Sequence, residues 1–257
     1  MGPAHLSIGT YNCHGFNQGS IYLRELLMHN DIICIQEHWL NSNECDKLSD
    51  LNNDFSVIAS YPVDSVLNRG ILKGRPFGGL AIFVRANLIK RINVVCKEDR
   101  LIIVQINNFM ICNVYMPCDN NELFCSILGS MSDFICNRDN SVDHYCVMGD
   151  FNCSYTQYNP LWSAFHCFTD SCKLECTLSD NKNNSLVTYR HATLNNSSMI
   201  DYIFVSESLC KYVLNTVIAD SGVNISDHIP VVVTFNADVY DNCGDAGCRN
   251  ISQNIPK

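Results

Sequence analysis

Short apolar runs bounded by turn residues recur along the chain, a pattern that is typical of buried strands. They predict strands over residues 5–12, 31–36, 55–60, 80–85, 91–96, 100–106, 109–115, 145–148, 199–205 and 229–235. Two other stretches, 20–30 and 120–137, repeat apolar residues every three or four positions and predict helices. In the second helix, Leu123, Ile127 and Leu128 belong to the expected buried face.

The order of these elements predicts how the strands pair. The strand, helix and strand within residues 5–36 form a βαβ unit, whose two strands run parallel and end at the same edge. The four strands between residues 80 and 115 have short connections, which favours a meander. We expect an α/β protein with two mixed sheets packed face to face and helices outside, formed by residues 5–236. The polar segment 237–257 lacks core residues and is expected to be a tail or linker.

Composition favours one sizeable domain in a reducing compartment. The chain has 257 residues, of which 47% are hydrophobic and 17% charged. Several of its 16 cysteines lie inside apolar runs, as Cys34, Cys112 and Cys146 do, so we expect free thiols and no stable disulfide framework. The start of the chain lacks a signal-peptide pattern, and no apolar run reaches membrane-spanning length. We therefore expect an intracellular protein, nuclear or cytoplasmic, that is not secreted and has no membrane partner.

Charge is distributed unevenly along the chain. The net charge of −9 argues against a nucleic-acid-binding surface that covers the whole protein. Eight of the 17 Lys and Arg residues nevertheless lie between Arg69 and Arg100, and they include Lys73, Arg75 and Arg85. This basic region is either a solvated face or a local surface that contacts phosphates, and the two interpretations carry similar weight.

Polar side chains gather where the predicted strands end. Asp150 and Asn152 follow the apolar run 145–148, and in extended backbone they would face the same way. Each such residue alone is explained by a turn or a cap. Together they are more polar groups than strand ends require: the carboxylates Glu37, Asp150, Asp201 and Asp227, the amides Asn12 and Asn152, the phenol of Tyr115 and the imidazole of His228.

The chemistry of this set fits hydrolysis of a phosphoester. Carboxylate oxygens suit a hard cation such as Mg²⁺, and a histidine next to a carboxylate is held in one tautomer. Uncatalysed phosphoester hydrolysis is very slow, so the reaction needs charge neutralisation as well as a base. The sequence therefore predicts metal-assisted attack of water on a phosphoester.

The motifs TYNCHG, IQE, NVYMP, GDFN, SMIDYIF and SDHIP occur in this order, and they resemble the endonuclease/exonuclease/phosphatase superfamily over residues 5–236. The resemblance implies the DNase-I-like four-layer α/β sandwich and Mg²⁺ as cofactor, with Mn²⁺ as a substitute. It implies a metal site at Glu37, with Asn12 and Asp227 as further ligands. The implied catalytic roles are a water-activating base for Asp150, a phosphate contact for Asn152, transition-state stabilisation for His228, orientation of His228 for Asp201, and a phosphate or water contact for Tyr115.

Within the superfamily, Tyr115 resembles the apurinic/apyrimidinic endonuclease branch. The phrases QEHWL, GGLAIFV, MIDYIFVS and SDHIPVV are most similar to endonuclease domains of LINE-type non-LTR retrotransposons. That resemblance implies a domain that nicks DNA, leaves a 3′-hydroxyl and works with a downstream reverse transcriptase. It also implies phosphate contacts for Thr188 and Ser198. Lys73 and Arg75 of the basic region are further candidates for binding the substrate. Two alternatives stay open: a phosphoesterase that acts on RNA or a small molecule, and a catalytically idle binding module.

Overall fold

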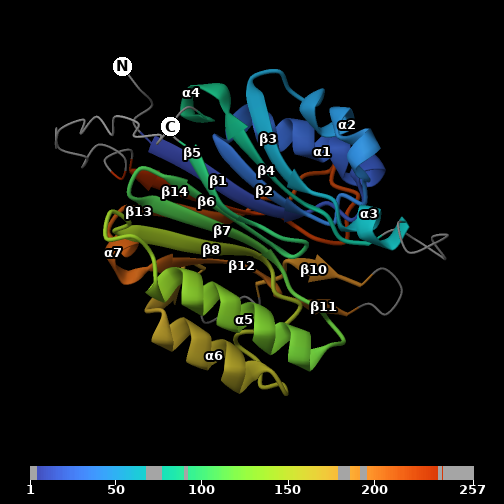
Figure 1. Ribbon diagram of the computed structural model, residues 1–257. Coiled ribbons are helices and arrows are strands. Elements are labelled where there is room, and N and C mark those ends of the chain that lie inside the picture. Colours follow the sequence, from blue (N-terminus) through green and yellow to red (C-terminus); the bar gives the residue numbers. More distant parts are fainter. Residues whose placement is uncertain are drawn as a thin grey trace, which may run out of the picture.

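The computed structural model describes residues 5–67, 77–89, 92–178, 186–191, 196–236 and 239. Two six-stranded mixed sheets pack face to face, and helices cover their outer faces (Figure 1). A short two-stranded ribbon, β10 (Tyr189–Arg190) with β11 (Ser197–Ser198), forms a third sheet, and Tyr189 makes an isolated bridge with His228 before β14. This is the DNase-I-like α/β architecture that the motifs imply.

The first sheet has the strand order β13-β14-β1-β2-β4-β3. Its parallel pair is β1 with β2, joined by helix α1, so the predicted βαβ unit is confirmed. Helix α1 begins at Phe16, four residues before the expected start at Ser20. The strands are β1 (His5–Asn12), β2 (Ile32–Gln36), β3 (Phe55–Ser60), β4 (Leu80–Arg85), β13 (Val213–Ile218) and β14 (Val231–Asn236).

The second sheet has the order β5-β6-β7-β8-β12-β9. The expected meander is confirmed only for β5, β6 and β7, because β4 pairs with β2 and β3 in the first sheet and the chain crosses between the sheets after it. The strands are β5 (Ile92–Lys97), β6 (Leu101–Ile106), β7 (Phe109–Tyr115), β8 (His144–Asp150), β9 (Leu174–Cys176) and β12 (Asp201–Ser206).

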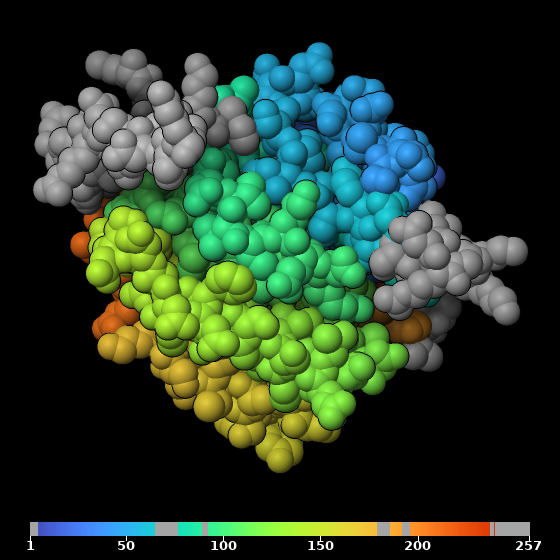
Figure 2. Space-filling view, in the orientation of Figure 1, coloured from blue at the N-terminus to red at the C-terminus, as the bar shows by residue number. Residues whose placement is uncertain are grey.

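Longer helices cover the outer faces, and short ones connect the strands. Helix α1 lies on the first sheet, whereas α5 and α6 lie on the second, at the bottom of the surface seen in Figure 2. The helices are α1 (Phe16–His29), the 3₁₀ turn η1 (Ser42–Glu44), α2 (Asp46–Ser49), α3 (Pro62–Leu67), α4 (Ala86–Ile89), α5 (Asn121–Cys136), α6 (Trp162–Ser171) and α7 (Glu207–Cys210). None of the helices in these described ranges is long and apolar enough to cross a membrane.

Alternation along the strands builds three apolar cores. In β2, Ile32 and Cys34 point into the core between the sheets, whereas Ile33 and Ile35 pack on the α1 side. A third core joins the second sheet to α5 and α6. Within α5 the expected face is shifted: Leu123 is 38% exposed, and Phe124 is buried instead.

The structure bears on two expectations, the state of the cysteines and the residue at which the core ends. Every cysteine in the described part of the chain is a free thiol, and Cys34, Cys112 and Cys146 are buried, as the apolar runs predict. The expected core boundary at residue 236 is too early, because Val239 is fully buried in the core between the sheets. The rest of the segment 237–257 lies outside the described residues.

Candidate active site

Strand register brings the polar strand ends together at one edge of the two sheets. In the second sheet, Tyr115 pairs with Asp150, and Asp150 pairs with Asp201. In the first sheet, Asn12 pairs with Gln36, the residue before Glu37. The parallel pairs β1–β2 and β7–β8 end at this edge, whereas the antiparallel β12 begins there with Asp201.

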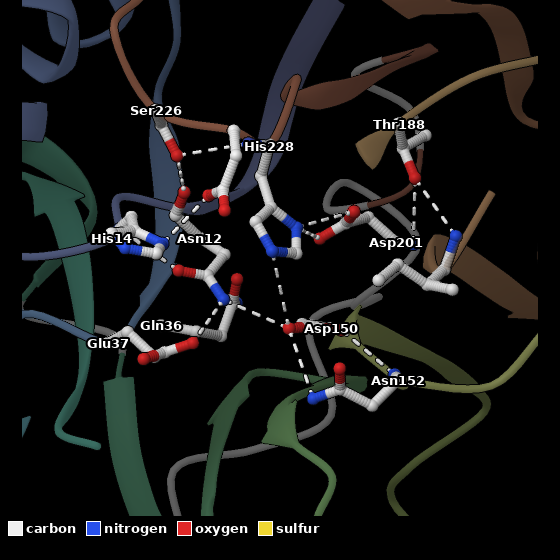
Figure 3. Close-up of polar contacts among 12 residues, drawn as sticks. Asn12, His14, Gln36, Glu37, Asp150, Asn152, Thr188, Asp201, Ser226 and His228 are labelled. Carbon is white, nitrogen blue, oxygen red and sulfur yellow. Dashed lines mark hydrogen bonds and ion pairs between the residues drawn. The ribbon is translucent and has the colours of Figure 1, made fainter. Parts of the chain in front are cut away.

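The amide of Asn12 joins the two sheets across this edge (Figure 3). Its Nδ2 donates to Oε1 of Glu37 at 2.8 Å and to Oδ2 of Asp150 at 2.9 Å. Its oxygen accepts a hydrogen bond from the backbone N–H of His14 at 3.0 Å, and the side chain is fully buried. Asn12 therefore links two carboxylates and fixes their orientations, and its oxygen accepts one hydrogen bond and keeps a second lone pair.

A second contact line runs from Asp201 through His228 to Asp150 (Figure 3). Nδ1 of His228 lies 2.9 Å and 3.1 Å from the two oxygens of Asp201, and Nε2 lies 3.9 Å from Oδ2 of Asp150. All three side chains are buried. The predicted orientation of His228 by Asp201 is therefore present in the geometry, with the other ring nitrogen directed at Asp150.

The pKa values of Asp150 and His228 are both raised, for different reasons. For Asp150, burial raises the pKa; the charge of His228 opposes this, and that of Asp201 adds to it. For His228, burial lowers the pKa, but the charges of Asp201 and Asp150 outweigh it and raise the pKa well above the ordinary value. The site therefore favours a cationic imidazole beside a carboxyl group that is more basic than usual.

The end of β8 depends on two residues with positive φ, Gly149 and Asn152. Gly149 has φ +146°, and a Cβ there would lie 1.9 Å from the carbonyl oxygen of Val114. Asn152 has φ +47°, so the expectation of extended backbone from Asp150 to Asn152 is wrong. The Asn152 amide still reaches Asp150, because the left-handed turn brings its N–H within 2.9 Å of Oδ1.

Tyr115 lies where the sequence predicts it, at the end of β7 beside the carboxylates. Burial, followed by the charges of Glu37 and Asp150, raises the pKa of its phenol well above the ordinary value. The guanidinium of Arg100 lies 4.8 Å from the centre of its ring. Tyr115 is therefore a neutral hydroxyl donor at the site across the physiological pH range.

The donor set fits a divalent metal ion at Glu37 and Asp227. Both side chains are partly exposed, whereas Asp150 and Asp201 are buried. After burial, the charges of Asp227, Asp150 and Glu37 contribute to the raised pKa of Tyr189, so these carboxylates lie near its phenol. Among the described residues, Asp150, Asp201 and His228 form a cluster whose ligand atoms lie within 4.8 Å of one another. Carboxylates that converge in this way repel one another unless a cation neutralises them, and hard oxygen donors suit Mg²⁺ or Mn²⁺.

The expected substrate contacts are placed differently. Thr188 is fully buried, and its Oγ1 accepts hydrogen bonds from the N–H groups of Ile200 and Asp201, each at 3.0 Å. In this conformation its hydroxyl supports the backbone of Asp201. Ser198 is partly exposed on β11, and its carbonyl accepts from the N–H of Thr188. Lys73 and Arg75 lie outside the described residues.

Arg85 does not contribute to a phosphate-contacting surface at the site. It is the last residue of β4, at the end opposite to Leu80, which pairs with Gln36 beside the site. Its Nε donates to Asp31 at 3.0 Å, and its Nη2 donates to the carbonyl of Asn30 at 2.7 Å. This part of the basic region therefore stabilises the fold.

Three site residues were missed by reasoning from the strand pattern. Nδ1 of His14 lies 2.8 Å from Oδ1 of Asp227; after burial, which raises the pKa of Asp227, this contact lowers it below the usual range. Nε1 of Trp39 donates to Glu37 at 2.9 Å. The ring of Tyr189 lies 4.9 Å from that of His228. Their signal in the sequence is proximity, because each is within two residues of a candidate site residue or of Thr188.

Comparisons with known proteins agree with this geometry. The sequence matches the model of the Endonuclease/Exonuclease/phosphatase family over residues 9–228, and the chain therefore belongs to this family. No curated protein matches the sequence. The catalytic class of the family is that of nucleases and phosphoesterases, which hydrolyse phosphoesters.

Solved structures with the same fold include two AP endonucleases and a 3′ phosphatase. The AP endonuclease from Archaeoglobus fulgidus has a TM-score of 0.67 at 17% identity, covering 90% of this chain and 99% of that one. The AP endonuclease LMAP from Leishmania major has a TM-score of 0.69 at 14% identity, covering 91% and 88%. The 3′ phosphatase NExo from Neisseria, bound to product DNA hairpin, has a TM-score of 0.68 at 17% identity, covering 90% and 99%. At these identities the likeness concerns the fold.

Proposed function

We propose that this chain is a divalent-metal-dependent endonuclease that hydrolyses one phosphodiester of DNA and leaves a 3′-hydroxyl end. One observation carries the proposal: Asp150 belongs to a single contact network. On one side the amide of Asn12 connects Asp150 to Glu37, and on the other side Asp150 lies beside the buried His228–Asp201 pair. A carboxylate for a metal, a base and a cation for the phosphate are thus held in one network.

In this proposal Asp150 is the general base. Its oxygens are fixed by N–H groups of Asn12 and Asn152. The raised pKa makes Asp150 a better proton acceptor near neutral pH than an ordinary carboxylate. A water molecule next to it loses its proton to Asp150 while its oxygen attacks phosphorus. The bond from phosphorus to the 3′ oxygen breaks, and this oxygen takes up a proton from solvent water, which leaves a 3′-hydroxyl and a 5′-phosphate.

Charge develops on the phosphate as water attacks, and His228 is placed to stabilise it. The imidazolium is prepared in advance, because Asp201 holds Nδ1 and the pKa of the ring is raised. Tyr115 supplies a neutral O–H donor for the phosphate oxygens. The amide nitrogen of Asn152 donates to the carbonyl of Met116 at 2.9 Å and to Asp150 at 3.4 Å, and in this proposal the longer contact is exchanged for a phosphate oxygen. A Mg²⁺ or Mn²⁺ ion held by Glu37 and Asp227 would neutralise charge on the phosphate and the leaving oxygen.

We further propose that the chain is the target-nicking domain of a non-LTR retrotransposon, which acts before a reverse transcriptase. The support is the resemblance of QEHWL, GGLAIFV, MIDYIFVS and SDHIPVV to such domains. Mapping the nick positions on a long duplex tests this proposal. Recurrent nicks whose 3′ ends a polymerase extends are expected, and nicks scattered without preference would contradict it.

A second candidate function is hydrolysis of RNA or of a small phosphoester. It is favoured by the net charge of −9 and by the engagement of Arg85 with Asp31, which removes one cation from the expected DNA surface. A catalytically idle binding module is less well supported, because the carboxylates, the amides and the histidine of the site are all present and mutually bonded.

A substrate panel separates these functions. Supercoiled plasmid, duplexes with an abasic site or a 3′-phosphate, single-stranded RNA and a small phosphomonoester are incubated with Mg²⁺, with Mn²⁺ and with EDTA. We expect metal-dependent nicking of plasmid with 3′-hydroxyl products. Cleavage of RNA or the small ester without plasmid nicking would support the second function, and inactivity of the folded protein on every substrate would favour the binding module.

A further inference from the structure

We infer that Trp39 is a positioning residue of the metal site, whose indole N–H fixes the Glu37 carboxylate for a divalent cation. The inference rests on the proposed function, because it takes Glu37 to be a metal ligand. Nε1 of Trp39 donates to Oε2 of Glu37 at 2.9 Å, while Asn12 donates to Oε1 at 2.8 Å. Each carboxylate oxygen thus has a fixed donor, the hydroxyl of Tyr115 also hydrogen-bonds Glu37, and a lone pair that these donors leave unused is available to a cation.

The backbone conformation that brings these two side chains together is unusual. Glu37 has φ +58° and Trp39 has φ +59°, in the left-handed region that non-glycine residues seldom occupy. The segment is held from both sides, since the N–H of Gly15 donates to the carbonyl of Glu37 and the N–H of Trp39 donates to that of Gly78. Strained backbone held in this way is typical of functional sites.

The indole ring is packed so that its N–H has little freedom. A Cβ at Gly15 would lie 2.5 Å from the ring, so glycine is required for the ring to lie against this turn. The ring of His14 packs edge-on at 5.0 Å, and His14 is the partner of Asp227. Trp39 therefore contacts one candidate ligand directly and the other through His14.

A role in packing alone and a role in positioning predict different results for Trp39→Phe. Phenylalanine keeps an aromatic ring against Gly15 but has no N–H to donate. Loss of a hydrogen bond to a metal ligand typically weakens metal binding about 10–100-fold. A packing role predicts lower stability with unchanged metal affinity. A matched control is Trp162→Phe in α6, where the indole contacts the ring of His166 at a tilt, with ring centroids 4.1 Å apart.

The test is calorimetric titration of Mn²⁺ into the full chain, with thermal unfolding of the metal-free proteins alongside. We expect Trp39→Phe to bind Mn²⁺ at least about tenfold more weakly than the wild type. Trp162→Phe should keep the wild-type affinity, and Glu37→Gln should lose binding. In DNA nicking, Trp39→Phe should need about tenfold more metal for half-maximal rate, with a near wild-type rate at saturation. Wild-type Mn²⁺ affinity in Trp39→Phe would overturn the inference.

A second measurement does not require a change at Trp39. The chain has two tryptophans, so Trp162→Phe leaves Trp39 as the sole indole. Bound Mn²⁺ should quench its fluorescence with the affinity found by calorimetry. Absence of quenching while Mn²⁺ binds would contradict the inference alone. Mn²⁺ binding that Glu37→Gln leaves unchanged would contradict the metal site of the proposed function, and the inference with it.

Discussion

The carboxylate of Asp201 accepts a hydrogen bond from Nδ1 of His228 at 2.9 Å, in a place where both side chains are buried. Burial alone would keep the imidazole neutral, but the charge of Asp201 outweighs it and raises the pKa of His228. A buried cation paired in this way is costly to build and is maintained by its partner.

Asp201→Asn should lower the nicking rate about 10²–10⁴-fold, the usual range for loss of an effective acid–base or charge-stabilising group. The amide cannot stabilise an imidazolium as the carboxylate does, so the pKa of His228 falls. Because the cationic ring is the active form, the rate in the variant should decline as pH rises through neutrality, where the wild type stays active. A pH–rate profile measures this, and an unchanged alkaline limb would contradict the assigned role.

Thr188→Val should destabilise the fold and slow catalysis together. The substitution leaves the buried N–H groups of Ile200 and Asp201 without their acceptor, which costs about 1–3 kcal/mol for each unsatisfied group. Thr188→Ser keeps the hydroxyl and serves as the control, with a smaller effect on both quantities. Chemical denaturation and nicking kinetics check this. A rise in KM for DNA without loss of stability would instead support the phosphate contact that the family resemblance implies.

Gly149→Ala should destabilise the protein by about 3 kcal/mol or more, because the new Cβ meets the carbonyl oxygen of Val114 at a positive φ. Gly129→Ala is the matched control. Gly129 lies inside α5 with nothing within 4 Å of an added Cβ, so alanine should stabilise by roughly 0.5–1 kcal/mol. Urea unfolding measures both changes. Equal effects of the two substitutions would show that β7 and β8 are not packed as closely as described.

Stability should fall as pH drops from 6.5 to 4, in part because of His38. Burial lowers the pKa of His38 from 6.5 to about 4. The neutral ring lies 3.0 Å from the carbonyl of Ser60 through Nε2 and accepts from the N–H of Leu40 through Nδ1. Between these pH values the unfolded chain binds the extra proton and the folded chain does not, so stability rises with pH.

The lowering of the His38 pKa from 6.5 to about 4 limits this contribution to about 3–4 kcal/mol across the window. Denaturant unfolding at pH 7 and at pH 4.5 measures it. His38→Gln should reduce the loss of stability on acidification, whereas His5→Gln, at an exposed position, should not. Identical pH dependence in His38→Gln and wild type would show that this ring is not held neutral.

Much of the site could be predicted because its residues occupy strand ends. Apolar runs locate the strands, and the residues that follow them include Glu37 and Asp150. The pairing of Asp150 with Asp201 needs the order of strands in the sheet, which an alternating pattern does not specify. For the same reason β4 was expected in the meander, although it pairs within the other sheet.

What could not be predicted depends on backbone conformation and on contacts distant in sequence. Asn152 and Trp39 adopt positive φ values that neither propensity nor periodicity indicates for these residue types. Thr188 lies in a polar segment without clear periodicity, so its burial beneath Asp201 could not be read from the pattern. The strand β13 was also missed, because its alternating residues are mostly exposed at the edge of a sheet.

The central claim is that the Asp150–His228–Asp201 network hydrolyses a DNA phosphodiester with a divalent metal. Relaxation of supercoiled plasmid tests it most directly, with wild type, Asp150→Ala and His228→Ala compared in Mg²⁺ and in EDTA. Tyr158→Phe, at a residue that is 88% exposed, is the matched control. The account predicts metal-dependent open-circle product from wild type and control, and none above background from the two site variants. Nicking that survives in folded Asp150→Ala or His228→Ala protein, or that persists in EDTA, would contradict it.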